Sequence, residues 1–217
     1  MFLSPIKLFS ILTAINNQFE RVQRIASYAL PKDILSKSEK ELMALRALGL
    51  KLLYVGIETG DDELLKWVNK GETFDLTING IQKAHDAGID TSIMIITGLG
   101  GKKYSRQYAL RSADIINRLQ PKFLSTLTLS MPFGQEHFQH RFKGDYQQQT
   151  VKELSEELLM FIRHLDVDNV IYRSDHVSNN LVLKGVFARD KEKLIAHLNQ
   201  AITSTSDNIY PSTSTIL

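Results

Sequence analysis

The stretch LKLLYVGI, residues 50–57, followed by ETG, residues 58–60, decides the fold class of this sequence. The apolar run is short and nearly continuous, which is typical of a strand that is covered on both faces. Asp61 and Asp62 come next, and acidic residues directly after a turn favour the start of a helix. We therefore expect a buried strand that ends at Glu58 and leads at once into a helix.

The same alternation of helix and strand runs along most of the chain. Further strands are predicted at residues 22–30, 89–97, 123–131 and 169–172, and helices at residues 5–18, 38–48, 61–70, 74–87, 104–119, 150–165 and 190–202. Pro31 breaks the first of these strands, and Ser38 with Glu41 forms a capping box for the second helix. Short connections between alternating elements indicate parallel strands joined by right-handed crossovers. The pattern predicts an α/β fold, an incomplete TIM-like βα barrel of about five parallel strands. A closed barrel needs at least one strand more, so we expect that a segment is missing upstream and that Met1 is an internal methionine.

Composition excludes several classes of protein. The 217 residues are 43% hydrophobic and 23% charged, which fits one domain over residues 1–202 and a polar, flexible tail over residues 203–217. A formal charge of +2 without a dense basic run gives no case for nucleic acid. The apolar start is too short for a membrane span, so a cytoplasmic location is the default. With no cysteine and no HxH or HExxH spacing, the sequence predicts no metal site.

Four polar or glycine-containing turns follow the predicted strands, where parallel α/β folds gather their ligand loops. They are Glu58–Gly60, residues 97–101 (TGLGG), residues 130–134 (SMPFG) and residues 173–180 (RSDHVSNN). A carboxylate can accept hydrogen bonds from a nucleoside, and glycines expose backbone N–H groups to a ligand. The structural alternatives are a helix N-terminal acid, an ordinary glycine turn, a strand terminator and a solvated loop.

These turns resemble the adenosylmethionine-binding loops of radical SAM enzymes, and the likeness extends over roughly residues 1–202. The resemblance implies S-adenosylmethionine and a [4Fe–4S] cluster as cofactors, the cluster being held by a CxxxCxxC loop that this sequence lacks. Similar chains carry an Asn where this one has Asp175. The implied cofactor-binding residues are Glu58, Thr59, Gly60, Thr97, Gly98, Leu99, Met131 and Pro132, and the implied substrate residues are Arg173, Ser174, His176, Ser178 and Asn179.

The resemblance is to the C-terminal part of such enzymes, loosely those grouped with oxygen-independent coproporphyrinogen oxidase and the elongator-type catalytic subunit. It implies a barrel portion that binds adenosylmethionine weakly at most and is inactive alone. One alternative is a non-catalytic remnant that acts as a binding or dimerisation module and self-associates through its open strand edge. The other, a cysteine-free aldolase or isomerase, ranks last because Lys51 and Lys122 stand at strand starts rather than strand ends.

Overall fold

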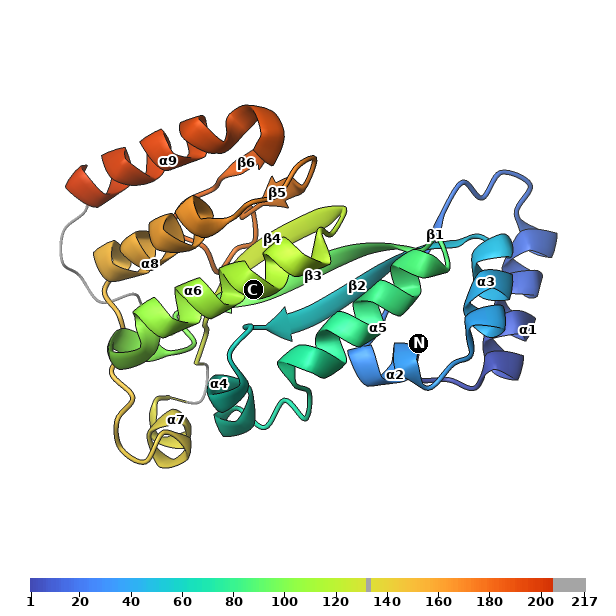
Figure 1. Ribbon diagram of the computed structural model, residues 1–217, viewed down its shortest axis with the longest axis horizontal. Helices are drawn as coiled ribbons and strands as arrows, with labels where there is room; N and C mark the ends of the chain where they lie inside the picture. The colour runs from blue at the N-terminus through green and yellow to red at the C-terminus, as the bar shows by residue number, and fades with distance from the viewer. Residues whose placement is uncertain (132–133, 205–217) are drawn as a thin grey trace.

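The computed structural model describes residues 1–131 and 134–204, which form an α/β fold around a six-stranded sheet (Figure 1). The sheet order is β1-β2-β3-β4-β5-β6, and β1 to β5 run parallel. The strands are β1 (Ile25–Tyr28), β2 (Leu50–Glu58), β3 (Asp90–Thr97), β4 (Phe123–Thr128), β5 (Ile171–Arg173) and β6 (Lys184–Val186). The helices are α1 (Pro5–Gln18), α2 (Pro31–Leu35), α3 (Glu39–Ala47), α4 (Asp62–Trp67), α5 (Phe74–Asp86), α6 (Gly101–Leu119), α7 (Glu136–Arg141), α8 (Val151–His164) and α9 (Phe187–Ser204).

The predicted fold class is confirmed, but the prediction of five parallel strands missed β6, which pairs antiparallel with β5. The chain turns back after β5 because Ser174 closes the loop. Its backbone N–H donates to Leu183 O at 2.8 Å, and its hydroxyl oxygen accepts the Leu183 N–H at 2.8 Å. These bonds bring a short strand beside β5 without the helical crossover that a parallel strand would need.

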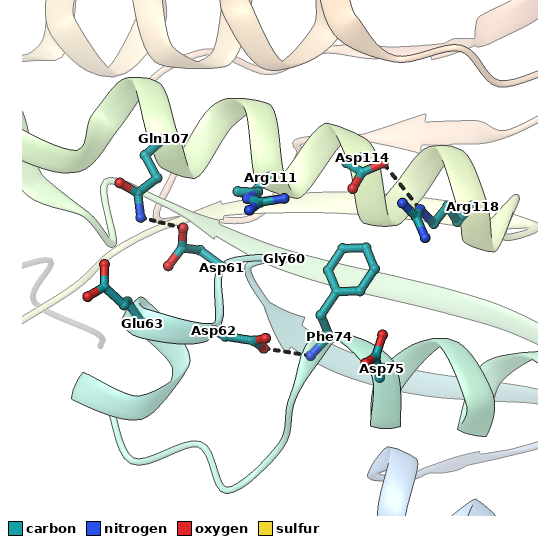
Figure 2. A pocket seen from close by; sticks show the side chains of 10 residues that line it. All are labelled: Gly60, Asp61, Asp62, Glu63, Phe74, Asp75, Gln107, Arg111, Asp114 and Arg118. Carbon is teal, nitrogen blue, oxygen red and sulfur yellow. Dashed lines mark hydrogen bonds and ion pairs between the residues drawn. The ribbon is translucent and has the colours of Figure 1, made fainter.

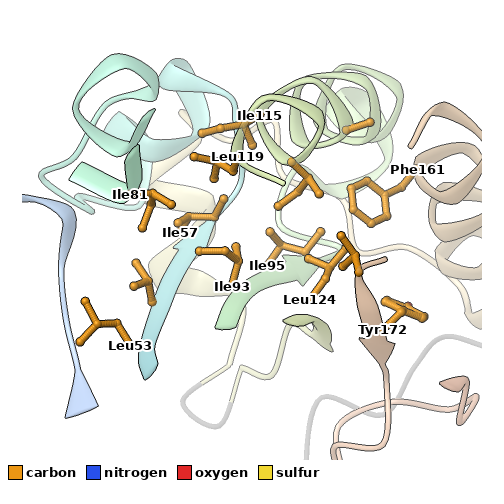
Figure 3. Close-up of a cluster of buried hydrophobic side chains, with 14 of the residues drawn as sticks. Leu53, Ile57, Ile81, Ile93, Ile95, Ile115, Leu119, Leu124, Phe161 and Tyr172 are labelled. Carbon is orange, nitrogen blue, oxygen red and sulfur yellow. The ribbon is translucent and has the colours of Figure 1, made fainter. Parts of the chain in front are cut away.

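One face of the sheet is covered by α5, α6 and α8 (Figure 3). Ile57 on β2, Ile93 on β3 and Leu124 on β4 lie beneath these helices, and each is at most 2% exposed. Burying a side chain of this size stabilises the fold by about 1.5–3 kcal/mol. The main core therefore lies between the sheet and this helical layer.

The opposite face, here called the open face, carries Tyr28, Tyr54, Met94, Ser125 and Arg173. The strand register places them on one side of the sheet, since Tyr28 pairs with Tyr54 and Met94 with Ser125, which in turn pairs with Arg173. Each of these side chains is partly or fully exposed. The expectation that the strand at residues 50–57 is covered on both faces therefore holds only at its start, where Leu52, on the side of Tyr54, is 2% exposed. From Tyr54 onward the residues on the open face are partly exposed.

Local signals account for several helix boundaries. The predicted capping box at Ser38 is present, since the Ser38 hydroxyl accepts the Glu41 N–H while the Glu41 carboxylate accepts the Ser38 N–H. Pro31, which was expected only to break a strand, also begins α2 from a first-turn position where its missing N–H costs nothing. The start of α6 at Gly101 lies three residues before the expected one, because the turn at Gly98 continues directly into the helix.

The C-terminal helix α9 continues to Ser204, and the rest of the expected tail lies outside the described residues. Within residues 1–131 and 134–204, no helix has the length and apolarity needed to cross a membrane.

Candidate functional site

The residues predicted from the four turns lie along one edge of the sheet, here called the carboxyl edge, where β2 to β5 end. Glu58 ends β2, Thr97 ends β3, and Met131 follows β4. The loop that follows Arg173 leaves the end of β5. Pro132, which was also predicted, lies outside the described residues. Because β2 to β5 are neighbouring parallel strands, the described members of the set share this edge.

Glu58 adopts an unusual backbone conformation at this edge. Its φ of 65° lies in the left-handed region, and the pairing of β2 with β3 breaks register between Gly56 and Glu58. A Cβ atom added to Gly56 would lie 3.0 Å from Glu58 Oε1, so the carboxylate folds back over Gly56 on the open face. A non-glycine residue in this conformation costs on the order of 1–3 kcal/mol, and such residues cluster at functional sites.

Lys70, from the loop after α4, forms an ion pair with Glu58. The two side chains are 17% and 19% exposed, so the pair lies partly buried at the carboxyl edge. The sequence reading placed Lys70 only at the end of a helix. The ion pair between Lys70 and Glu58 depends on the path of the loop after α4. No residue spacing in the sequence predicts this pair.

Thr59 and Gly60 turn away from the open face and pack against α6. The Thr59 and Ser112 hydroxyl oxygens lie 3.1 Å apart, and the Gly60 N–H donates to Ser112 Oγ at 3.4 Å. A Cβ atom on Gly60 would lie 2.2 Å from the Arg111 carbonyl oxygen. The glycine therefore permits close approach to α6, and Glu58 is the member of this turn whose side chain faces the open side.

At the end of β3, both main-chain polar groups of Gly98 are bonded within the protein. Its N–H donates to Glu157 Oε1 at 2.7 Å, and its carbonyl oxygen accepts the Tyr146 hydroxyl at 3.2 Å. Thr97 is buried and donates to Leu127 O at 3.1 Å, while Leu99 lies in the core. Gly98 has a φ of +82°, and a Cβ there would lie 2.9 Å from Leu154 Cδ2.

Glu157, on α8, is a carboxyl group that sequence reasoning missed. It is 1% exposed, and burial raises its pKa to about 7, although hydrogen bonds from Ser105, Gly98 and Gln149 act in the opposite direction. Its position in the sequence held a signal, since residues 154, 157, 158 and 161 recur at the spacing of a buried helix face. An acidic residue inside such a stripe indicates a buried, hydrogen-bonded carboxyl group.

The loop after β5 is tied to the end of β4 by residues that were predicted to contact substrate. The Thr128 N–H donates to Ser178 Oγ at 3.2 Å, and the Thr128 hydroxyl donates to Asn179 Oδ1 at 3.0 Å. Asn179 Nδ2 donates to the carbonyl oxygens of Thr126 and Ser174 at 2.8 and 3.0 Å. Ser174 and Ser178 are buried, whereas Arg173 and His176 are exposed. Ser174 and Ser178 hold the loop in place, and His176 is tied to it as well, since its Nδ1 accepts the Ser178 N–H at 3.1 Å.

Two hollows lie near these elements. One, of about 730 Å³, lies between α6 and the starts of α4 and α5 (Figure 2), where Gln107 donates to Asp61 and the Phe74 N–H donates to Asp62. It lies on the helical side, and of the predicted residues only Gly60 lines it. The other, of about 250 Å³, lies on the open face and includes Arg173 and Asp175. The start of the β5 loop thus lines the open-face hollow, whereas Asn179 lines a smaller one of about 30 Å³ together with Thr97 and Thr128.

The residues present fit the two implied cofactors differently. None of the 217 residues is a cysteine, so they do not fit a [4Fe–4S] cluster held by thiolates. Across residues 1–131 and 134–204 there is also no group of three or more side chains suited to a metal ion. A carboxylate facing the open side, as Glu58 does, fits the hydroxyl or ammonium groups of a nucleoside ligand.

Comparison with solved structures finds the same fold in longer proteins. Coproporphyrinogen III oxidase HemN from Escherichia coli, described as a radical SAM enzyme, matches with a TM-score of 0.58 and 18% identity over 74% of this chain and 37% of that chain. Elp3 of the archaeon Methanocaldococcus infernus matches with a TM-score of 0.55 and 17% identity over 82% and 42%. Methylornithine synthase PylB matches with a TM-score of 0.52 and 14% identity over 92% and 63%.

The chain thus spans less than two thirds of the length of each of these proteins. At these identities the likeness shows the fold alone. No curated protein matches the sequence. The family model for the radical SAM superfamily matches residues 8–113, which include the strand end at Glu58 and the turn at Gly98. Over residues 8–113, the chain is therefore similar in sequence to the radical SAM superfamily.

Proposed function

We propose that this chain binds S-adenosylmethionine weakly where β2 and β3 end, and that it is a portion of a radical SAM enzyme without turnover of its own. The observation that carries the proposal is Glu58. Its left-handed backbone at a break in the sheet register keeps a carboxylate over the open face, next to the strand that ends at Thr97. Backbone strain of this kind is retained when the surroundings or the function require it.

Glu58 would accept hydrogen bonds from the ribose hydroxyls or the ammonium group of the ligand. Ile96 and Leu127, which pair across β3 and β4 and are half-buried, offer an apolar surface for a flat ring. Met131 follows β4, and in this proposal its main chain faces the adenine. Pro132, the other proposed contact, lies outside the described residues. Thr59, Gly60, Thr97 and Leu99 act through the packing that holds the two strand ends together.

Arg173 and His176 are the proposed substrate contacts, because they are the exposed members of the predicted substrate set. Ser174, Ser178 and Asn179 would position them through their bonds to β4 and β6. Reductive cleavage of adenosylmethionine needs a reduced iron–sulfur cluster, whose thiolate ligands must come from outside these 217 residues. The chain's own contribution is therefore binding and orientation.

Equilibrium dialysis with radiolabelled S-adenosylmethionine tests the proposal, with Glu58→Gln as the variant and Glu63→Gln as the matched control. Glu63 is exposed in the first turn of α4, close in sequence to the site. We expect Glu58→Gln to weaken binding about tenfold or more, since hydrogen bonds to charged groups contribute about 1.5–3 kcal/mol. Equal binding by both variants, or no binding by the natural sequence, would overturn the proposal.

Tyr28 favours a second candidate function, a binding or dimerisation module. Within residues 1–131 and 134–204, β1 pairs with another strand on one side only. Tyr28 at its end is 74% exposed, and its ring centroid lies 5.5 Å from that of Tyr54. A strand edge with an exposed aromatic side chain is a ready site for pairing with a second copy. Light scattering at increasing concentration tests this, and a dimer that Tyr28→Lys dissociates would support it. A monomer at all concentrations would exclude dimerisation through this edge.

A further inference from the structure

Behind the turn at Gly98 lies a buried polar cluster that the proposed site does not use. Glu157 on α8 meets Gln149 and Ser105, and Gln149 Nε2 donates to Glu157 Oε2 at 3.1 Å and to Ser105 Oγ at 3.1 Å. The partners that the described residues supply to the Glu157 carboxyl group are thus neutral donors. Burying a carboxylate without a cationic partner is unfavourable, whereas the hydrogen bonds of the cluster stabilise the ionised form. The protonated and ionised forms of Glu157 are therefore close in free energy.

Gly98 is held by this cluster from two directions. Its N–H donates to Glu157, and its carbonyl oxygen accepts the Tyr146 hydroxyl. Both main-chain polar groups that Gly98 could offer to a ligand are therefore already hydrogen-bonded. The segment that carries Tyr146 is packed tightly on the turn, since a Cβ on Gly101 would lie 2.6 Å from Gln147 O. A ligand that needs the Gly98 N–H must therefore compete with Glu157.

Gln149 shows how that competition could change. Its side chain is 2% exposed, and its Oε1 atom has no hydrogen-bond partner among the described residues. An unpaired buried oxygen of this kind costs about 1–3 kcal/mol. Oε1 faces Gly98, beside a small void of about 10 Å³ lined by Gly98, Thr128 and Met131. A half-turn of the amide exchanges its oxygen and nitrogen, which fill nearly the same space. After such a turn, Oε1 would lie next to the Glu157 carboxyl group. It could then accept a hydrogen bond from the hydroxyl of protonated Glu157.

We propose that Glu157 is the positioning residue of the Gly98 turn. When ionised, it holds the Gly98 N–H away from the carboxyl edge. When Glu157 takes up a proton, its hydroxyl donates to Gln149 Oε1, the bond to Gly98 weakens, and the Gly98 N–H becomes available to an anionic group of a ligand. The part that concerns a ligand rests on the adenosylmethionine site proposed above, whereas the part that concerns the turn does not.

Of Glu157 and the titratable groups that face it, we expect only Glu157 to change charge near neutral pH. Burial raises the pKa of Tyr108, on α6, and of Tyr146 above their usual value near 10, so both stay neutral. Glu153, one turn earlier on α8, is paired with Lys102 at 2.9 Å, and hydrogen bonds from Thr150 and Lys102 outweigh burial and lower its pKa. Glu58 acts on Tyr108 from the end of β2 and is paired with Lys70.

The test is a pH titration of the Gly98 amide by ¹⁵N–¹H NMR, without ligand, in the natural sequence, Glu157→Gln and Glu156→Gln. Glu156 is exposed on the same helix, and all three proteins keep every histidine. We expect the Gly98 amide signal to shift with a midpoint near pH 7 in the natural sequence and in Glu156→Gln, and to be flat in Glu157→Gln. No inflection between pH 5.5 and 8 in the natural sequence, or an unchanged inflection in Glu157→Gln, would overturn the proposal.

Two further readouts keep the result decisive. If Glu157→Gln fails to fold, the ¹³C shift of the Glu157 carboxyl carbon in the natural sequence reports its charge directly and must follow the Gly98 amide. Adenosylmethionine affinity should rise about fivefold or more from pH 8 to pH 6, a usual size for coupling between sites, and Glu157→Gln should abolish the change. If the Gly98 amide signal shifts with pH but no adenosylmethionine binds at any pH, the proposed function is wrong, whereas the proposed role of Glu157 still holds.

Discussion

The ends of β2 and β3 lie next to each other on the same sheet, but they are built in opposite ways. At the end of β2, the Glu58 carboxylate faces the open side and has a flexible lysine as its partner. At the end of β3, Gly98 is bonded on both sides by buried groups, Glu157 and Tyr146. The β2 end thus offers a charged side chain at once, whereas the β3 end offers its main chain only after a rearrangement.

This difference shows that a glycine has more than one use at a strand end. Gly60 and Gly98 both stand in turns that resemble ligand loops, and both lie where an added Cβ would collide with the protein itself. Their immediate role is close packing, on α6 for Gly60 and on α8 for Gly98. A ligand function at Gly98 is compatible with that packing only if α8 can release the turn.

The largest effect should come from adding a methyl group to the tighter of the two turns. In Gly60→Ala the new Cβ would lie 2.2 Å from Arg111 O and 2.8 Å from Ile115 Cγ2, and neither the helix backbone nor a buried isoleucine can move aside cheaply. Overpacking of this severity costs about 3 kcal/mol or more. Urea unfolding at pH 7.5 measures the loss of stability.

Gly56→Ala, on β2 just before this turn, is the control for this change. Its Cβ would meet Glu58 Oε1 at 3.0 Å, the end of a side chain that can swing away. We expect it to destabilise the protein by less than half as much as Gly60→Ala. Equal losses from the two substitutions would show that the turn after β2 is not packed against α6 as described.

The next effect is a dependence of stability on pH that belongs to the β3 end. The pKa of Glu157 is raised from 4.5 to about 7 in the folded protein, so the folded state binds a proton more readily than the unfolded state. The stabilisation is complete below pH 4.5, declines as the pH rises, and is lost above pH 7. A shift of this size corresponds to on the order of 3 kcal/mol. Thermal unfolding from pH 4.5 to 8 measures it.

His85 acts in the opposite direction, because burial lowers its pKa and its stabilisation is lost as the pH falls below 6.5. The curve of the natural sequence alone therefore mixes the two groups. Glu157→Gln retains His85, so subtracting the stability of this variant from that of the natural sequence isolates the contribution of Glu157. This difference in stability should fall from pH 4.5 to pH 7. A difference that is constant with pH would contradict the raised pKa.

Much of the fold could be predicted from local patterns, whereas the charged partners in the site could not. The capping box at Ser38, the apolar run before Glu58 and the glycine after Thr97 act within a few residues, and each was placed correctly. β6 was missed because its three residues have little strand character apart from the closure at Ser174. The pairing of Glu58 with Lys70 depends on a loop path, which periodicity does not encode.

The burial of Glu157 could be predicted from the sequence, but its hydrogen-bond partner could not. Its place on the buried stripe of α8 was available from the sequence, but its partner Gly98 is separated from it in sequence by the whole of α6, β4 and α7. Only the packing of α8 on the sheet brings the two together. For the same reason, the sequence suggested that the Gly98 turn was open to a ligand, and the structure places a carboxyl group there.

The smallest expected change in stability concerns the β2 end, where Lys70→Met removes the partner of Glu58. A partly exposed ion pair contributes about 0–1 kcal/mol, so unfolding should change little. If Glu58 binds the cationic groups of adenosylmethionine, however, losing a competing lysine should strengthen binding several-fold. Equilibrium dialysis measures this, with Lys66→Met, an exposed lysine on α4, as the control. Weaker binding in Lys70→Met than in the control would mean that the lysine contacts the ligand itself, and Glu58 would then orient Lys70 rather than bind the ligand.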